Sequence, residues 1–122
     1  MQALSPREAS RQARAASPNR PTITVLADLP DARLMVIRLA PGQAVPPHHN
    51  ASTVIVTVLE GQGVLSGAAA ERRCATGDVV VYEPSETHGI RATDAELLVL
   101  VTVAPGPGKR SGAQGPPMTS TL

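Results

Sequence analysis

Residues 42–61 read GQAVPPHHNASTVIVTVLEG, and a second glycine-led stretch, residues 77–92, reads GDVVVYEPSETHGIRA. Two of the three histidines of the chain are His48 in the first stretch and His88 in the second. Apolar runs bounded by turn residues surround both, without a convincing helical period. We therefore expect two imidazoles from distant parts of the chain to meet inside one small β-barrel, and this meeting point is the candidate site.

The middle of the chain reads as a series of short strands. Runs rich in Val, Ile, Leu and Thr alternate with Gly, Pro and Asp turn signals. This pattern predicts an all-β antiparallel sandwich or barrel instead of a βαβ fold. The expected strands are 22–27, 32–40, 53–59, 64–66, 72–75, 79–82, 89–92 and 96–103.

The composition predicts one folded domain with two tails. Residues 21–104 hold the apolar runs and form the expected barrel. Residues 1–20 have few large apolar side chains, and residues 105–122 are rich in Pro and Gly, so we expect both ends to be disordered. A barrel of this size is marginally stable alone and benefits from a partner.

Charge and aromatic content argue against a nucleic-acid partner. The formal net charge is +1, with the positive charge in the ends: residues 21–104 have five Arg against nine Asp and Glu, or −4. The chain has no Trp, no Phe and one Tyr, so it lacks platforms on which bases stack. The Arg-rich N-terminus is read as a solvated tail, with a phosphate-binding arm or an organelle transit peptide as alternatives.

Membrane association is not expected either, because no apolar run approaches the ~20 residues that span a bilayer. The single cysteine, Cys74, cannot form an intramolecular disulfide, which fits a cytoplasmic location. Cys74 follows Arg72 and Arg73, which could lower its pKa. A small residue in a strand is the simpler interpretation of Cys74.

In residues 42–92 the chain resembles the cupin superfamily, whose members are small jelly-roll barrels of the double-stranded β-helix type. Residues 42–61 and 77–92 match the spacing of its two sequence motifs, G-x5-H-x-H-x3-E-x6-G and G-x5-P-x-G-x2-H-x3-N. The resemblance implies a small, single-domain, RmlC-like barrel. The matching positions are Gly42, His48, Asn50, Val54 and Gly61 in the first motif, and Gly77, Glu83, Ser85, His88 and Ala92 in the second, with Pro84 one residue late.

The departures from the motifs concern the metal ligands. Metal-holding cupins use three histidines and one glutamate at four of these positions. Here His48 and His88 are kept, but Asn50 stands where the family has its second His and Val54 where it has Glu. The resemblance therefore implies a degenerate ligand set.

A weak metal site remains possible with the residues present. Successive side chains of a strand alternate, so His48 and Asn50 are expected to face the barrel interior and His49 to face away. Two imidazoles and an amide oxygen suit a borderline divalent ion such as Zn, Fe, Ni, Cu or Mn, completed by water. Glu86, two residues before His88, is a candidate substitute acid, although a surface role is the simpler interpretation.

The interior wall beside this site is expected to be aliphatic. Val54, Val56 and Val58 alternate along one strand, so they share a face and form the predicted substrate pocket for a small organic ligand. The side of Tyr82 depends on strand register and stays unassigned. Residues 54–59 and 97–103 are apolar on both faces, so their outer faces are expected to pack on another sheet or in a homodimer.

Two functions stay open at this point. One is a small cupin that binds a divalent transition metal, a small organic ligand or both in the barrel, as in a metal-dependent dioxygenase- or isomerase-like enzyme. The other is a non-catalytic, metal-free cupin that acts as a ligand-binding, sensing or assembly module, with its histidines as hydrogen-bonding groups only. Whether the chain is an enzyme is undecided by the sequence, because barrels of this type host many reactions.

Overall fold

The structure is a computed structural model, and it describes residues 1–15 and 18–107. This part of the chain is built almost entirely of antiparallel strands, as the sequence predicted. The elements are α1 (Pro6–Gln12), β1 (Thr22–Asp28), β2 (Arg33–Leu39), β3 (Ala44–His48), β4 (Thr53–Ser66), β5 (Glu71–Ala75), β6 (Val79–Tyr82) and β7 (His88–Ala104).

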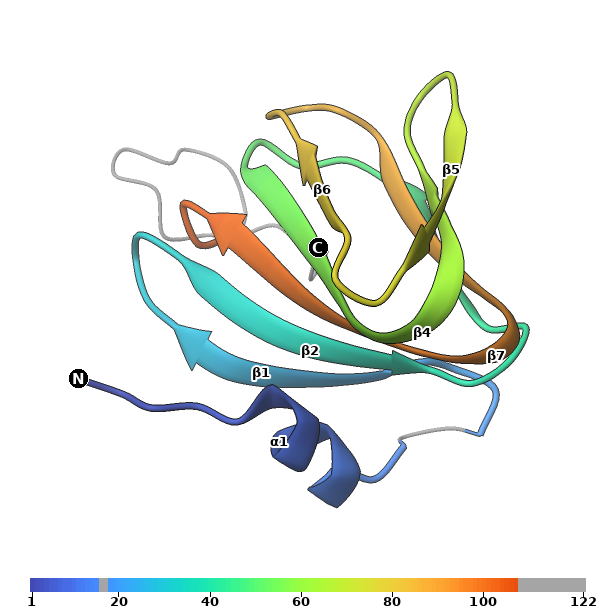
Figure 1. Cartoon of the computed structure of the whole chain (residues 1–122). Coiled ribbons are helices and arrows are strands. Elements are labelled where there is room, and N and C mark those ends of the chain that lie inside the picture. The colour runs from blue at the N-terminus through green and yellow to red at the C-terminus, as the bar shows by residue number, and fades with distance from the viewer. Residues whose placement is uncertain (16–17, 108–122) are drawn as a thin grey trace.

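The strands form one antiparallel sheet that folds over on itself (Figure 1). Its main path runs β1, β2, β7, β4, β5, while β3 pairs with β7 and β6 pairs with β4. The two longest strands, β4 and β7, are paired through most of their length. Both strands curve, so each contributes to both layers (Figure 1). This arrangement is the cupin-type double-stranded β-helix that the motifs implied.

Glycines in β4 permit its close approach to β7. Gly61 has a φ of 90°, and a Cβ there would lie 2.1 Å from the carbonyl oxygen of Glu96. A Cβ on Gly63 would lie 2.5 Å from the Leu97 side chain. The sequence indicated a turn here between two strands, whereas the structure has one strand with two register shifts, because these glycines let β4 continue through the irregularity.

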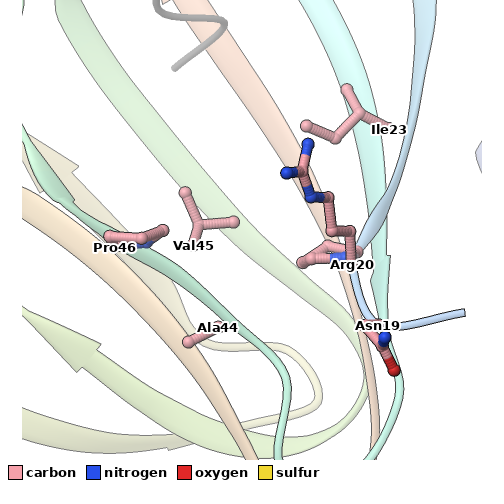
Figure 2. Close-up of a pocket in the computed structure, with 7 residues that line it drawn as sticks. Asn19, Arg20, Ile23, Ala44, Val45 and Pro46 are labelled. Atoms are coloured by element: carbon pink, nitrogen blue, oxygen red, sulfur yellow. The ribbon is translucent and has the colours of Figure 1, made fainter. Parts of the chain in front are cut away.

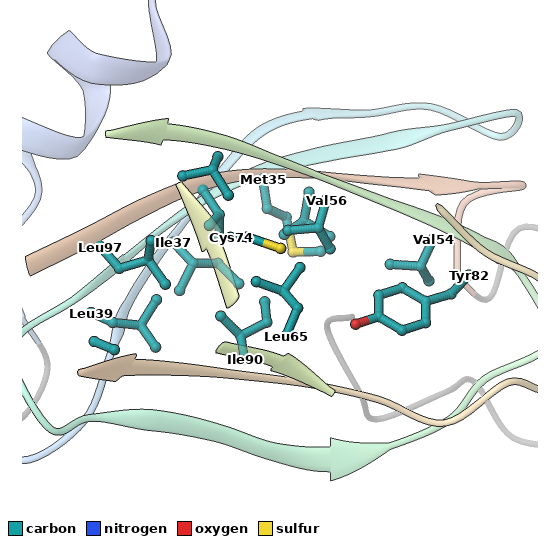
Figure 3. Packing of buried hydrophobic residues seen from close by; sticks show 14 of the residues in the cluster. Met35, Ile37, Leu39, Val54, Val56, Leu65, Cys74, Tyr82, Ile90 and Leu97 are labelled. Atoms are coloured by element: carbon teal, nitrogen blue, oxygen red, sulfur yellow. The ribbon is translucent and has the colours of Figure 1, made fainter. Parts of the chain in front are cut away.

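The core lies between the two layers and is aliphatic apart from one tyrosine (Figure 3). Alternate residues of β2, β4 and β7 supply most of it, as expected for strands with one face inward. The buried cluster comprises Met35, Ile37, Leu39, Val54, Val56, Val58, Leu65, Cys74, Tyr82, Ile90, Ala92, Leu97, Val99, Val101 and Val103.

Within the described part of residues 1–20, the structure has a short helix where the sequence predicted a disordered tail. Pro6–Gln12 forms α1, with proline in its first turn and Glu8 and Arg11 placed favourably for the helix dipole. Arg38 of β2 donates hydrogen bonds to the carbonyl oxygens of Ser10 and Ala13 and to the Ser10 hydroxyl. The segment is ordered by these polar contacts, which hydrophobic periodicity does not reveal.

The docked helix also accounts for part of the doubly apolar character of β7. Leu98 pairs with Arg38 on one side and with Glu60 on the other. Both partners bond to α1: Arg38 donates to Ser10, and Glu60 accepts from Arg7. Leu98 is accordingly only 6% exposed. The chain thus covers one part of this outer face with its own helix.

The end of the described chain is attached to the barrel at two points. The Ser52 hydroxyl donates to the Pro105 carbonyl at 2.7 Å, and the Gly106 N–H donates to the Pro30 carbonyl at 3.1 Å. Most of the C-terminal tail expected over 105–122 lies outside the described residues. Among the helices of the described part, none is long and apolar enough to cross a membrane.

Candidate functional site

The two histidines singled out by the sequence meet in the structure. His48 ends β3 and His88 begins β7, and the two are direct partners in the antiparallel register. Their ring centroids are 4.3 Å apart with an interplanar angle of 63°. His88 is 1% exposed and lies inside the barrel, whereas His48 is half-buried at the end of the edge strand β3.

Backbone carbonyls orient both rings. His48 Nδ1 lies 3.0 Å from the Pro46 carbonyl oxygen, and His88 Nδ1 lies 3.2 Å from the Glu86 carbonyl oxygen. A carbonyl only accepts, so each Nδ1 carries a proton, and the neutral form of a ring bonded in this way has its lone pair at Nε2. Both Nε2 atoms are buried, and His48 Nε2 has no hydrogen-bond partner within the described residues. Metal-bound histidines are oriented in this same way.

The sequence around His48 explains its placement. Pro46 and Pro47 have no N–H to donate, and the β3–β7 register shifts between Val45 and His48. Proline is tolerated here because β3 is an edge strand. The shift then brings His48 opposite His88.

Asn50 braces the loop that follows β3. It is 4% exposed, and its side-chain oxygen accepts the Ser52 N–H at 2.9 Å in a local turn. Its backbone carbonyl accepts the Ser85 N–H at 2.8 Å, which joins the loop after His48 to the loop before His88. Asn50 thus follows His48 by two residues in the chain, and these two hydrogen bonds stabilise the loops next to the histidines.

Glu86 closes the second loop. Its carboxylate is exposed and accepts the Glu83 N–H at 2.8 Å, while its own N–H donates to the Glu83 carbonyl at 3.0 Å. Glu86 contacts the His88 ring through its backbone carbonyl, which accepts from His88 Nδ1, and not through its carboxylate. Ser85, between them in the turn, has a φ of 70°.

The three valines of the predicted pocket share one inward face of β4. Val54, Val56 and Val58 are each 1% exposed and are packed in the buried cluster. The wall is aliphatic, as expected, and is part of the core. The exposed side chain of His49 points away from this interior, as alternation predicted.

Tyr82 is the site residue that sequence reasoning could not place. Register puts it opposite Val54, on the inward face of β6, with its ring centroid 5.3 Å from that of His88. Its hydroxyl donates to the Ser66 carbonyl at 3.0 Å. Burial, followed by the nearby charges of Cys74 and Glu86, raises the pKa of Tyr82 to about 12, so the phenol is neutral at physiological pH.

Cys74 is buried in the core and does not resemble a reactive thiol. Burial raises its pKa, and the Asp78 carboxylate adds to this effect, against a smaller lowering by Arg72. A raised pKa keeps the sulfur in the less nucleophilic thiol form.

A surface groove of about 450 Å³ lies between the start of β1 and β3 (Figure 2). Its wall is mainly apolar, and Arg20 is the charged residue among those that line it. It reaches Pro46, whose carbonyl orients the His48 ring. The lining residues are Asn19, Arg20, Pro21, Ile23, Ala44, Val45 and Pro46.

The donor set at the histidine pair is small. Within residues 1–15 and 18–107, no group of three or more His, Cys, Asp or Glu side chains is arranged to hold a metal ion. The two imidazoles, next to the Tyr82 ring, are therefore the histidine donors that the described residues bring together there.

Comparisons with known proteins agree with this architecture. No curated protein matches the chain. It is similar to the KdgF structure from Halomonas sp. (21% identity, 80% of this chain and 88% of the other covered, TM-score 0.72). It is also similar to a double-stranded β-helix domain protein from Klebsiella pneumoniae (23%, 87% and 91%, TM-score 0.77) and to an RmlC-like cupin from Desulfovibrio desulfuricans (30%, 77% and 91%, TM-score 0.68).

The family model that matches the chain is that of the cupin domain, over residues 35–104. The match spans β2 to the end of β7 and includes both histidines of the pair. This chain belongs to the cupin domain family.

Proposed function

We propose that this cupin binds a divalent transition metal ion in the barrel interior through Nε2 of His48 and Nε2 of His88. One observation carries the proposal. The imidazole of His48, from the first motif, meets that of His88, from the second. Each ring bonds through Nδ1 to a backbone carbonyl, and this leaves the lone pair of the neutral ring at a buried Nε2. A buried nitrogen with no partner, as at His48, is costly unless something binds it.

The residues present fit a two-nitrogen site for a borderline ion. Imidazole nitrogen suits Zn, Fe, Ni, Cu or Mn, and the remaining positions are filled by water or by a small organic ligand. The side-chain oxygen of Asn50, which accepts the Ser52 N–H, is the candidate for an added oxygen ligand, because Asn50 stands at a motif position where metal-holding cupins have a ligand. The exposed Glu86 carboxylate already shapes its own turn and is the weaker candidate.

The inward face of β4 would supply apolar surface to a ligand bound at the histidine pair. Val54 and its neighbours on the inward face of β4 would contact the hydrophobic part of a small organic ligand. A bound divalent ion would act as a Lewis acid on a ligand oxygen or lower the pKa of a bound water. The neutral Tyr82 phenol beside His88 is held by Ser66, so it orients the site without adding charge.

The second candidate function is a metal-free module that binds a small ligand, senses it or supports assembly. The absence of a three-residue ligand group in the described chain favours it. In that case His48 Nε2 accepts a hydrogen bond from the ligand. For either function we propose a cytoplasmic location, because the single buried cysteine needs no oxidising compartment.

Calorimetric titration of tag-free, chelator-treated protein with Zn²⁺ tests the proposal. We expect one ion per chain, and we expect His48→Ala and His88→Ala each to weaken binding by at least about 100-fold, because each removes one of two protein ligands. His49→Ala is the matched control and should bind as the parent does, since that side chain is exposed. Unchanged affinity in His48→Ala would overturn the assignment of His48 as a ligand, and a parent that binds no Zn²⁺ would leave the metal-free alternative.

A further inference from the structure

Tyr82 is the only aromatic side chain apart from the histidines, and it lies beside the histidine pair. It is 4% exposed and comes from β6, a strand that belongs to neither histidine (Figure 3). Every other large side chain of the buried cluster is aliphatic or sulfur-containing. An aliphatic residue would fill this volume without requiring a hydrogen-bond partner.

The tyrosine contacts the site at two points. Its ring is tilted by 47° against the His88 imidazole at a centroid distance of 5.3 Å. Its hydroxyl donates to the carbonyl of Ser66, which pairs with Gly89, the residue directly after His88. The phenol therefore joins β6 to the part of β4 that lies next to His88.

The packing around this anchor is tight. A Cβ on Gly89 would lie 2.7 Å from the Ser66 hydroxyl and 3.3 Å from Cα of Pro47, which directly precedes His48. Pro47 of β3, Gly89 of β7 and Ser66 of β4 are thus closely packed across three neighbouring strands. Tyr82 therefore bonds to a residue that is closely packed against Gly89, the residue directly after His88.

We propose that Tyr82 is a positioning residue for the His48–His88 pair: its ring packs against the His88 imidazole and holds it, and its bond to Ser66 attaches the tyrosine to β4. This inference rests on the proposed function for its relevance to metal binding. The orientation of the rings themselves can be measured without any metal.

Tyr82→Phe and Tyr82→Leu separate the two contacts. Phenylalanine keeps the ring against His88 and loses the bond to Ser66, whereas leucine loses both. We expect Zn²⁺ affinity within about 3-fold of the parent for the phenylalanine variant and roughly 10- to 100-fold weaker for the leucine variant, the range seen when groups that orient metal ligands are removed. Val101→Ala, a core truncation away from the pair, is the control: it should lower the melting temperature and leave affinity unchanged.

The second measurement is the ¹⁵N chemical shift of the imidazole nitrogens in metal-free protein. The parent and the phenylalanine variant should show His88 in the single tautomer protonated at Nδ1, and the leucine variant should show values averaged between tautomers. Parent-like shifts and parent-like affinity in Tyr82→Leu would overturn the positioning role. If the parent binds no Zn²⁺, the proposed function fails, and the ¹⁵N comparison alone decides the role of Tyr82.

Discussion

His48 and His88, 40 positions apart in the sequence, face each other as direct partners across the β3–β7 ladder with ring centroids 4.3 Å apart. A strand pairing fixes which side chains share a face, and a slip by one residue would send one ring to the other side. The register shift at the two prolines of β3 therefore decides whether the chain has a histidine pair at all.

The single tyrosine makes its environment directly measurable. Absorbance at 295 nm during an alkaline titration should report Tyr82 alone, with a midpoint at about 12 in the folded protein and near 10 in urea. Burial is the main cause, because it disfavours the phenolate. A folded-state midpoint near 10 would show that the ring is solvated.

The same shift has a consequence for stability. The folded chain binds the phenolic proton more tightly than the unfolded chain, so this stabilisation is complete below about pH 10 and is lost as the pH rises toward about 12. Chemical denaturation at several alkaline pH values should show a steeper loss in the parent than in Tyr82→Phe. Equal losses in both proteins would contradict the linkage.

Gly61 should be far less replaceable than Gly77. Both have positive φ, but a Cβ on Gly61 would overlap the Glu96 carbonyl at 2.1 Å, whereas Gly77 has open space around it. We expect Gly61→Ala to cost roughly 3 to 5 kcal/mol in unfolding free energy and Gly77→Ala about 1 to 2 kcal/mol, from backbone strain alone. Guanidinium denaturation followed by circular dichroism measures both, and equal costs would mean that β4 and β7 are not in close approach there.

The fold could be predicted from the sequence because its signals are local. Apolar runs and glycine turns marked most strands, and the spacing of His48 and His88 matched the family motifs. The division of β4 near Gly61 was wrong, because a glycine that permits a bend inside a strand looks the same in sequence as one that ends it. β3 was also not among the expected strands, since its two prolines obscure the strand pattern.

The site was only partly predictable, because its remaining parts depend on long-range pairing. The side of Tyr82 follows from its pairing with Val54, and no local pattern shows this. The side chains of Asn50 and Glu86 accept backbone N–H groups of their own loops, and the geometry of these turns determines both hydrogen bonds. The docking of α1 was missed because it depends on Arg38, a polar contact across 28 positions.

Arg38 should be the residue that holds α1 on the barrel. Its guanidinium bonds to Ser10 and Ala13, so Arg38→Met should release the helix and speed tryptic cleavage after Arg11 and Arg14 at least about 10-fold while the barrel stays folded. Arg7→Ala removes a hydrogen bond to the Leu59 carbonyl and an ion pair with Glu60 whose side chains are 51% and 52% exposed, the ion pair being worth about 0.5 kcal/mol, and should change cleavage after Arg11 and Arg14 little. Unchanged cleavage in Arg38→Met would assign the docking to other contacts.

We propose that two copies of the chain associate through the outer face of β6 and β4. Val79 and Val81 are 56% and 59% exposed, and Val81 pairs with the half-buried Ile55, which gives an apolar strip that α1 does not bond to. Light scattering at micromolar concentration should give about twice the 12.6 kDa chain mass. Val81→Lys should return the mass to that of one chain, while Leu29→Lys, at a comparably exposed turn position, should not; a monomeric parent would rule the dimer out.

The most direct test of the account is the electron paramagnetic resonance spectrum of the protein loaded with one equivalent of Cu²⁺. If His48 and His88 hold one ion together, pulsed measurements should show two imidazole nitrogens coupled to the copper in the parent and in His49→Ala, and one in His48→Ala. A parent spectrum with no coupled imidazole, or one left unchanged by His48→Ala, would contradict the claim that the two rings form a single metal site.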